Sequence, residues 1–362
     1  MKIKEKKMLR QSNYELLRTV CMIFIVGIHF TTQTAIGTFS LSNGIDYYYA
    51  VLIGTAGRFA CNTFVIIGAW FLVDKEFKAS RILNLWIEIF LYSVSITIVC
   101  MILKFENANI ITLIQAFFPI MGRPVWFGAE YICLLLLTPF LNKMLMKQNI
   151  TITKKVLGIF AILIIGCATI FPIEHVTPAF SELTWFCFLY LITGLYKHGQ
   201  IQVSQFIEKY SGWLFLICYV GLCSIKILAD YMQWNILNSL YAYYRVHYEA
   251  LPGVLCSILL FIYFKNLRIT YNRIINRVSE STFAVYVIHQ TPAFYRDMWN
   301  KLFDINTKIQ EYNAIIYSIG VMAVIFAGCT LIDCIRKYIC TRYVYKTKMY
   351  IILCDRIEKM YC

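Results

Sequence analysis

Runs of about twenty apolar residues recur along the whole chain, and they constrain its fold more than any other feature of the sequence. The core of a lipid bilayer holds no water that could hydrogen-bond a free backbone group, so a chain crosses it as helices or as a closed barrel. A helix needs about twenty residues for one crossing, which is the length of these runs. The pattern therefore predicts an all-α protein, a polytopic bundle of transmembrane helices.

Hydropathy along the chain predicts about ten membrane spans. Their expected bounds are 13–36, 50–73, 82–103, 124–143, 155–172, 182–197, 211–229, 248–265, 280–299 and 313–335. Of the 362 residues, 59% are hydrophobic and only 15% are charged, which leaves little room for a separate soluble domain. We expect one membrane-embedded domain, 1–362, with a leading segment 1–12 and a basic tail 336–362.

The positions of lysine and arginine predict the orientation of this bundle. With the N-terminus in the cytoplasm, 25 of the 34 basic residues lie on the cytoplasmic side, 6 lie in the opposite loops, and Arg18, Arg58 and Lys226 lie within spans. Basic residues are enriched in the cytoplasmic loops of membrane proteins, so we expect an even number of spans and both termini in the cytoplasm. The net charge of +14 follows from these loops, and without a basic cluster on one folded surface it does not predict a nucleic-acid partner.

The fourteen cysteines predict neither a disulfide framework nor a metal site. Nearly all of them lie within apolar runs or in segments expected on the cytoplasmic side, where a cysteine acts as a small hydrophobic residue. The sequence has no Cys-x-x-Cys pair and no cysteine and histidine spacing typical of zinc. We therefore expect no metal.

Arg18 and His29 enclose an apolar stretch of the first expected span. Eleven helical steps advance roughly 1100°, about 20° past three full turns, so both side chains lie on one face of the helix. They are roughly 16 Å apart along its axis, about half the thickness of the hydrocarbon core. Ionisable groups within a membrane are costly and mark candidate functional sites, although Arg18 could also extend to the interface from its helix end.

Four ionisable residues lie at comparable depth in different spans: His29, Arg58, Glu130 and His289. Buried charges are costly unless they are paired, so we expect these side chains to approach one another. We interpret the other polar residues of the apolar runs and loops as packing or pairing groups: Glu88, His175, His198, His247 and Asp333. The aromatic segment 230–247 is typical of either a sugar-stacking surface or a membrane-interface belt.

Several of these segments also resemble a known family. Arg18 followed by ten residues and His29 is similar to the Arg-x10-His signature of the integral-membrane acyltransferase-three family, and more narrowly of bacterial exopolysaccharide and O-antigen O-acetyltransferases. The resemblance continues through 58–68, 126–142 and 281–289. In one position the sequence differs, because Ile67 stands where the family commonly has the serine of Phe-x-x-Ser-Gly.

The resemblance implies an enzyme of the bacterial cytoplasmic membrane that is an O-acetyltransferase. Acyl-CoA, usually acetyl-CoA, would bind from the cytoplasm, and the acyl group would pass to a hydroxyl of an extracytoplasmic or lipid-linked cell-surface glycan. Arg18 would contact the phosphates or the pantetheine arm of CoA, and His29 would act as the general base on the acceptor hydroxyl. Direct transfer and a covalent acyl-histidine step both remain open.

The remaining candidate residues have supporting roles in this interpretation. Arg58 could stabilise a developing oxyanion, and Glu130 could orient an imidazole or the sugar. Asn62, Trp126 and His289 are expected to bind substrate. Either Thr63 or Asn62 could replace the hydrogen bond of the missing serine.

Two other classes of protein fit a polytopic chain with intramembrane charges. A proton-coupled transporter or flippase of a small molecule or lipid-linked sugar could use the same arginine, glutamate and histidines as a proton relay. The sequence shows no internal repeat, which argues against that class. A membrane sensor or assembly subunit is the third class, and only the generic fold supports it.

Overall fold

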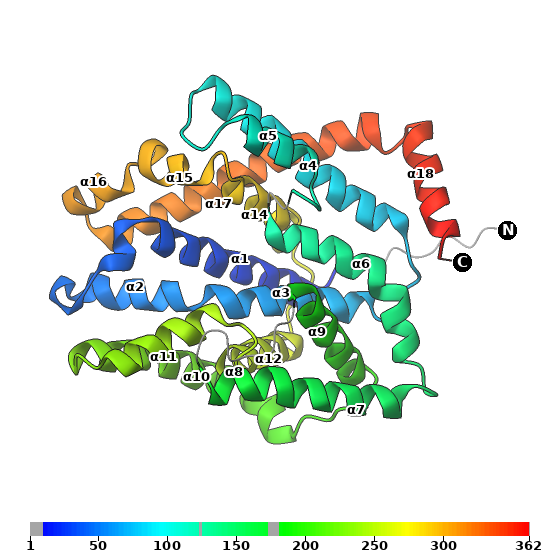
Figure 1. Cartoon of the computed structure of the whole chain (residues 1–362), viewed down its shortest axis with the longest axis horizontal. Helices are drawn as coiled ribbons and strands as arrows, with labels where there is room; N and C mark the ends of the chain where they lie inside the picture. The colour runs from blue at the N-terminus through cyan, green and yellow to red at the C-terminus, as the bar shows by residue number, and fades with distance from the viewer. Residues whose placement is uncertain (1–9, 123–124, 173–180, 362) are drawn as a thin grey trace.

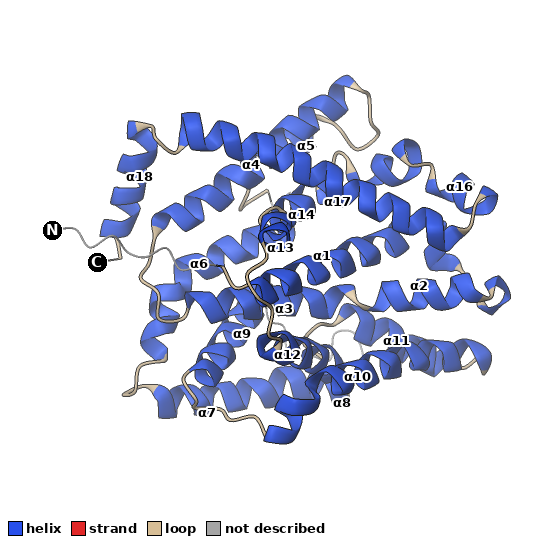
Figure 2. Cartoon of the chain, turned by 180° about the vertical axis from the view of Figure 1, so that it is seen from behind, coloured by secondary structure: helices blue, strands red, loops and turns tan. Residues whose placement is uncertain are grey.

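The computed structural model describes residues 10–122, 125–172 and 181–361, and within these ranges all regular structure is helical (Figure 2). The α-helices are α1 (Ser12–Gln33), α2 (Ile45–Thr55), α3 (Gly57–Leu72), α4 (Ala79–Ile102), α5 (Ile110–Phe117), α6 (Trp126–Met144), α7 (Ile150–Phe160), α8 (Cys167–Ile170), α9 (Glu182–Lys197), α10 (Gln205–Tyr231), α11 (Asn235–Val246), α12 (Leu251–Asn266), α13 (Arg273–Ser279), α14 (Thr282–Gln290), α15 (Tyr295–Asp297), α16 (Ile305–Glu311), α17 (Ala314–Ile339) and α18 (Lys348–Lys359). Short 3-10 or π-helical turns complete it: η1 (Ala35–Thr38), η2 (Leu41–Asn43), η3 (Ala161–Gly166), η4 (Met298–Leu302) and η5 (Cys340–Val344).

Six helices or continuous helical runs in the described ranges are long and apolar enough to cross a membrane. They are α1, α2 with α3, α4, the run Ile150–Ile170, α10 and the run Ala314–Val344, and the bent pair α11 and α12, which meet at 47°, would make a seventh if they form one span. The all-α membrane fold is therefore confirmed. The expected count of ten is not established, because α9 and α14 have only 16 and 9 residues and α6 is more polar.

The ninth expected span, 280–299, is wrong as a single helix. In the structure α14 ends at Gln290, and Thr291 has an extended conformation with φ −58° and ψ 123°. The next residue is Pro292, which lacks a backbone N–H and disfavours helical geometry in the residue before it. As a result His289 lies in the last turn of a short helix instead of within a full span.

The C-terminal segment also differs from the expected basic tail, because the tenth span does not end at residue 335. Helix α17 continues to Ile339, and η5 extends the helical run to Val344. Helix α18 then turns back toward the start of α4, where Glu358 accepts a hydrogen bond from the backbone N–H of Ala79 at 2.9 Å and Tyr350 donates one to Asn84 at 2.7 Å (Figure 1). The described part of this tail, 336–361, is therefore largely helical and partly packed on the bundle.

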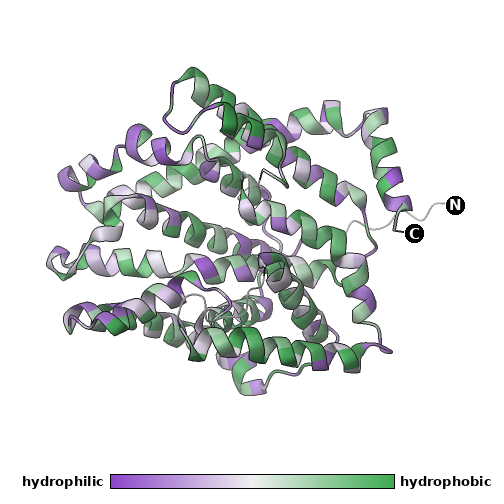
Figure 3. Cartoon of the chain, in the orientation of Figure 1, coloured by the Kyte–Doolittle hydropathy of each residue, from purple (hydrophilic) through white to green (hydrophobic). Residues whose placement is uncertain are grey.

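Helices α1 and α3 lie in the middle of the bundle, with α4 and α17 on one side and α10 and α11 on the other (Figure 1). In the apolar stretches of α1 and of the α2–α3 run, 56% and 72% of the residues are buried, against 28% or less in the other four spans. The outer helices expose large apolar side chains such as Ile162, Trp213 and Leu331. Figure 3 shows hydrophobic colouring along most of the helices and more hydrophilic colouring toward both ends of the bundle, as expected of helices in lipid.

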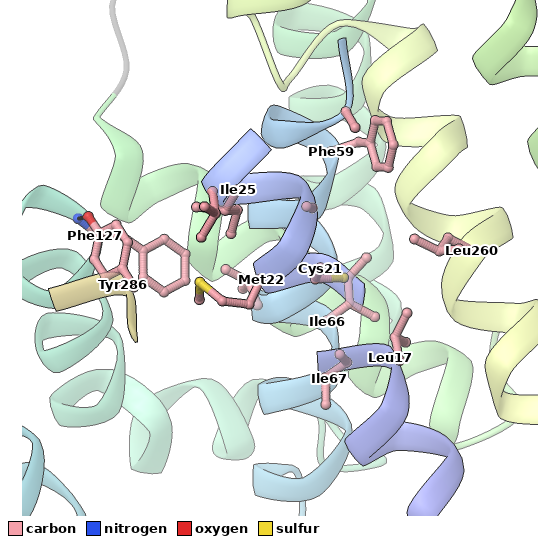
Figure 4. Close-up of a cluster of buried hydrophobic side chains, with 14 of the residues drawn as sticks. Leu17, Cys21, Met22, Ile25, Phe59, Ile66, Ile67, Phe127, Leu260 and Tyr286 are labelled. Atoms are coloured by element: carbon pink, nitrogen blue, oxygen red, sulfur yellow. Dashed lines mark hydrogen bonds between the residues drawn. The ribbon is translucent and has the colours of Figure 1, made fainter. Parts of the chain in front are cut away.

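The core surrounds α1 on both sides (Figure 4). On one side Met22 and Ile25 face Phe127 of α6 and Tyr286 of α14, and all four side chains are buried. On the other side the core comprises Leu17, Cys21, Phe59, Ile66, Ile67 and Leu260. Contacts on opposite faces hold α1 at a defined rotation, which fixes the directions of its polar side chains.

We name the two ends of the bundle by the helices that lie there. The α18 end is where α1 and α4 begin and where α3 and α17 finish, and the α16 end is the opposite one (Figure 1). Arg18 therefore lies in the half of α1 toward the α18 end and His29 in the half toward the α16 end, as their sequence positions require.

Candidate active site

Two histidines that are 260 residues apart in the sequence meet in the bundle. Nδ1 of His29 on α1 lies 2.9 Å from Nε2 of His289 on α14, within hydrogen-bond distance. The second ring nitrogen of His289, Nδ1, lies 2.5 Å from the carbonyl oxygen of Val285, one turn earlier in the same helix. His289 is completely buried, whereas His29 is partly exposed. The expected approach of these two side chains is confirmed.

Arg58, in the first turn of α3, lies against two aromatic rings. Its guanidinium carbon is 5.9 Å from the ring centroid of Trp126 and 5.9 Å from that of Tyr248. The two rings are nearly parallel, with 6° between their planes and 6.4 Å between their centroids. Arg58 is also close enough to His29 for their charges to interact. Cation–π contact accounts for an intramembrane arginine held at this depth.

Tyr248 is the residue of this site that sequence reasoning missed. It lies in the short link between α11 and α12, at the bend that separates them, and it is half-buried. On either side of it, Nδ1 of His247 contacts Oε1 of Glu249 at 2.7 Å. Hydropathy treats Tyr248 as the first residue of a span, but a tyrosine between two titratable residues just before Pro252 is a signal of a functional link.

Asn62 supports the link between α11 and α12 through a hydrogen bond. It is fully buried, donates a hydrogen bond from Nδ2 to the carbonyl oxygen of Tyr248 at 2.7 Å, and accepts one at Oδ1 from Nε1 of Trp185 on α9 at 2.9 Å. Asn62 therefore joins α3 to α9 and to the backbone that carries the Tyr248 ring. Its expected contact with substrate stays a prediction.

Glu130 lies on the same face of α6 as Trp126, one helical turn later, and it is half-buried. This face is the one whose Trp126 ring contacts Arg58. The placement agrees with a common depth for His29, Arg58 and Glu130, and the catalytic role of Glu130 stays a prediction.

Arg18 occupies the other half of α1. Its Nη1 atom is 3.8 Å from Oε2 of Glu15, and its guanidinium carbon is 5.9 Å from the ring centroid of Phe71. Oε2 of Glu15 also accepts a hydrogen bond from Ser279 at 2.5 Å. Between Arg18 and His29, the buried side chains of Met22 and Ile25 occupy this stretch of α1, so the two polar ends of the helix are separated by packed apolar groups.

Ile67, which stands where the resemblance leads one to expect serine, is a fully buried core residue. Its neighbour Gly68 lies against the side chain of Tyr131 from α6, because a Cβ atom at Gly68 would lie 2.1 Å from the hydroxyl oxygen of Tyr131. The segment around Ile67 therefore contributes to the core and leaves room for this tyrosine.

The residues interpreted as pairing groups have ionic partners. Arg336 contacts Glu88 at 3.1 Å and Asp333 at 2.7 Å, which confirms the interpretation of both carboxylates. His198 contacts Asp74 at 2.8 Å, and His247 is paired with Glu249. His175 lies outside the described residues. Within the ranges that the structure describes, no group of three or more metal-ligating side chains is found.

A lipid-facing helical bundle with histidines and an arginine gathered in its interior defines an integral-membrane protein with a polar site between its helices. A family model described as an acyltransferase domain matches residues 11–334. The chain therefore belongs to acyltransferase family 3 and is an acyltransferase, which acts on an acyl donor and an acceptor. Neither a curated protein nor a solved structure gives a significant match.

Proposed function

We propose that the protein transfers an acetyl group from a cytoplasmic acyl-CoA to a hydroxyl of an extracytoplasmic or lipid-linked glycan. The reaction would take place at the bacterial cytoplasmic membrane. The observation that carries this proposal is the hydrogen-bonded pair of His29 and His289 with Arg58 close by. A base and a cation together match the needs of acyl transfer to a hydroxyl. The family match makes acyl transfer the favoured alternative over transport.

In this mechanism His29 removes the proton of the acceptor hydroxyl while the hydroxyl oxygen attacks the carbonyl carbon of the thioester. The guanidinium of Arg58 stabilises the negative charge that develops on the carbonyl oxygen. When the tetrahedral intermediate collapses, the carbon–sulfur bond breaks and the imidazolium of His29 returns the proton to the CoA thiolate. The products are the O-acyl glycan and CoA, and His29 is again neutral.

The aromatic pair supports a sugar as the acceptor. Trp126 and Tyr248 present nearly parallel rings that are only partly buried, beside Arg58. Aromatic faces pack on the apolar faces of sugar rings while neighbouring polar groups bind the hydroxyls. Glu130, one turn from Trp126, would orient a sugar hydroxyl or an imidazole, and Asn62 would hold the Tyr248 link in position.

The α18 end of the bundle suits the acyl-CoA donor. Beside α13 and α17 at this end is a cavity of about 470 Å³ with four cationic side chains in its wall, namely Arg277, Lys337, Arg342 and Lys346. Together with Arg18 they supply charge for the phosphates of CoA, and an excess of basic residues favours the cytoplasmic side for this end and for both termini. For the thioester to reach His29, Met22 and Ile25 must separate from Phe127 and Tyr286.

Acetyl transfer by the purified full-length protein in lipid nanodiscs tests the proposal. Radiolabelled acetyl-CoA and extracted cell-surface glycan should yield labelled glycan, and His29→Ala should lower the rate by roughly 10²- to 10⁴-fold because the general base is lost. His198→Gln is the matched control, since His198 pairs with Asp74 far from the site. Full activity of a folded His29→Ala protein would refute the mechanism, and substrate movement across vesicles without label transfer would favour a transporter.

A further inference from the structure

We propose that His289 is a positioning residue, which fixes His29 in the tautomer whose free lone pair is at Nε2. The inference rests on the proposed role of His29 as a general base. It assigns His289 a task other than contact with substrate, and it names the single nitrogen atom that takes the proton of the acceptor.

The tautomer follows from the atoms that face each ring nitrogen. A carbonyl oxygen only accepts hydrogen bonds, so Nδ1 of His289, at 2.5 Å from the carbonyl oxygen of Val285, must carry the hydrogen. A neutral imidazole has one N–H, so Nε2 of His289 is an acceptor. The nitrogen that faces it at 2.9 Å, Nδ1 of His29, must then be the donor, which leaves Nε2 of His29 with its lone pair.

The surroundings of His289 favour the neutral ring. Its side chain is completely buried, and an isolated buried charge is costly. The neighbouring residues of α14 from Ala284 to Ile288 are also buried. Arg58 already acts on His29 with a positive charge, and a charged His289 ring would add a second positive charge next to His29.

Helix α14 holds the His289 ring in a defined place. The helix packs against α1, α4 and α17, and the Tyr286 hydroxyl oxygen accepts a hydrogen bond from the backbone N–H of Phe127 on α6 at 3.3 Å. The break at Thr291 and Pro292 places His289 in the last turn, where its ring reaches back to the carbonyl of Val285. The ring is therefore oriented before any substrate binds.

The same contact stabilises His29 during the reaction. When Nε2 of His29 takes the proton, the ring becomes an imidazolium whose Nδ1–H still donates to Nε2 of His289. A hydrogen bond from a charged donor is stronger than one between neutral groups, so His289 stabilises the charged intermediate more than the resting state. This is the task of the third member of a catalytic triad, performed here by a neutral imidazole.

The experiment combines nitrogen-15 NMR of histidine-labelled protein in nanodiscs with acetyl-transfer kinetics. In the wild type, the His29 signal, assigned by its loss in His29→Gln, should show a protonated Nδ1 and a bare Nε2. In His289→Leu it should show a mixture of both tautomers, and kcat should fall by roughly 100-fold with little change in the KM for glycan. His289→Gln should restore most of kcat, because the amide oxygen can replace Nε2 as the acceptor.

His198→Leu is the control for loss of a hydrogen-bonded histidine elsewhere, and it should change neither the His29 signal nor kcat. A protonated Nε2 on His29 in the wild type would overturn the inference, as would an unchanged tautomer and kcat in a folded His289→Leu protein. The NMR readout needs no substrate, so failure of the acetyl-transfer proposal would be seen as absent turnover with the tautomer still fixed.

Discussion

Arg58 shows how a single residue can be costly in a membrane and still be held in place. Its guanidinium lies 5.9 Å from the centroids of both Trp126 and Tyr248, and its charge acts on His29. A planar guanidinium can stack on an aromatic ring and still donate hydrogen bonds in its own plane. Such a group can contact the rings and an oxyanion at the same time.

Arg58→Lys should therefore be nearly as harmful as loss of the charge. The compact ammonium of lysine cannot stack on the rings and donate in a fixed plane at once, so we expect kcat/KM for acetyl transfer to fall by about 10- to 100-fold. Arg268→Lys, at an exposed position between α12 and α13, is the control and should keep wild-type kinetics. Wild-type kcat/KM in Arg58→Lys would mean that only the charge, and not the guanidinium geometry, contributes.

Much of the site could be predicted from the sequence because depth in a membrane follows from position along a span. Depth alone placed His29 and His289 at comparable levels, and the structure joins them at 2.9 Å. Hydropathy does not give the direction in which a side chain points around the bundle axis. For that reason the hydrogen bonds of Asn62 to Tyr248 and Trp185, which depend on how α3, α9 and α12 pack, could not be predicted.

Among the secondary-structure elements, long apolar runs were predicted correctly, and breaks within apolar sequence were not. The first span was expected at 13–36, and α1 covers Ser12–Gln33, because a long apolar run in lipid has no other stable form. The break after α14 was missed although Pro292 signals it, because the apolar residues on both sides look continuous in a hydropathy profile. The bend at Tyr248 was missed in the same way although Pro252 follows it closely, and its hydrogen bond from Asn62 depends on how α3 packs against this link.

The contact between Gly68 of α3 and the Tyr131 side chain of α6 gives a prediction for these two helices. Gly68→Ala should lower the free energy of unfolding by about 1–3 kcal/mol, because the new Cβ would lie 2.1 Å from the hydroxyl oxygen of Tyr131. Thermal or denaturant unfolding in detergent measures the change. Gly158→Ala in α7 is the matched control, since nothing lies within 4 Å of its Cβ position, and it should be neutral or slightly stabilising.

Tyr131→Phe should rescue Gly68→Ala. Without the hydroxyl, the nearest ring atom is 3.1 Å from the new Cβ, a contact that a small shift of the ring relieves. The double variant should then have nearly the same free energy of unfolding as Tyr131→Phe alone. Equal stability of Gly68→Ala and the wild type would show that the Tyr131 hydroxyl does not lie against Gly68.

The topology of the chain after residue 125 depends on whether α6 crosses the membrane. Its polar residues exclude it from the helices that are apolar enough to cross by composition. Its C-terminal end nevertheless lies beside the end of α3, where Nδ2 of Asn142 is 3.5 Å from the carbonyl oxygen of Lys75, and Tyr190 of α9 donates to Oδ1 of Asn142 at 2.8 Å. Its N-terminal end carries Trp126, which contacts Arg58 at the beginning of α3. Helix α6 therefore extends from the level of Arg58 at the beginning of α3 to the level of Lys75 just after its end.

An epitope tag inserted after Lys147, in the exposed link between α6 and α7, distinguishes the two topologies in the full-length protein. With the proposed orientation, in which both termini are cytoplasmic, an α6 that crosses puts the tag in the cytoplasm with Lys75, and antibody should reach it only after spheroplasts are permeabilised. If α6 does not cross, the chain stays outside after α4, so antibody should reach the tag in intact spheroplasts. A tag after Gly44, in the exposed link between η2 and α2, should be reached from outside in either case and controls for access. We expect the cytoplasmic result, because an α6 outside the bilayer would remove Trp126 from Arg58 and leave that guanidinium in the membrane without one of its two aromatic partners.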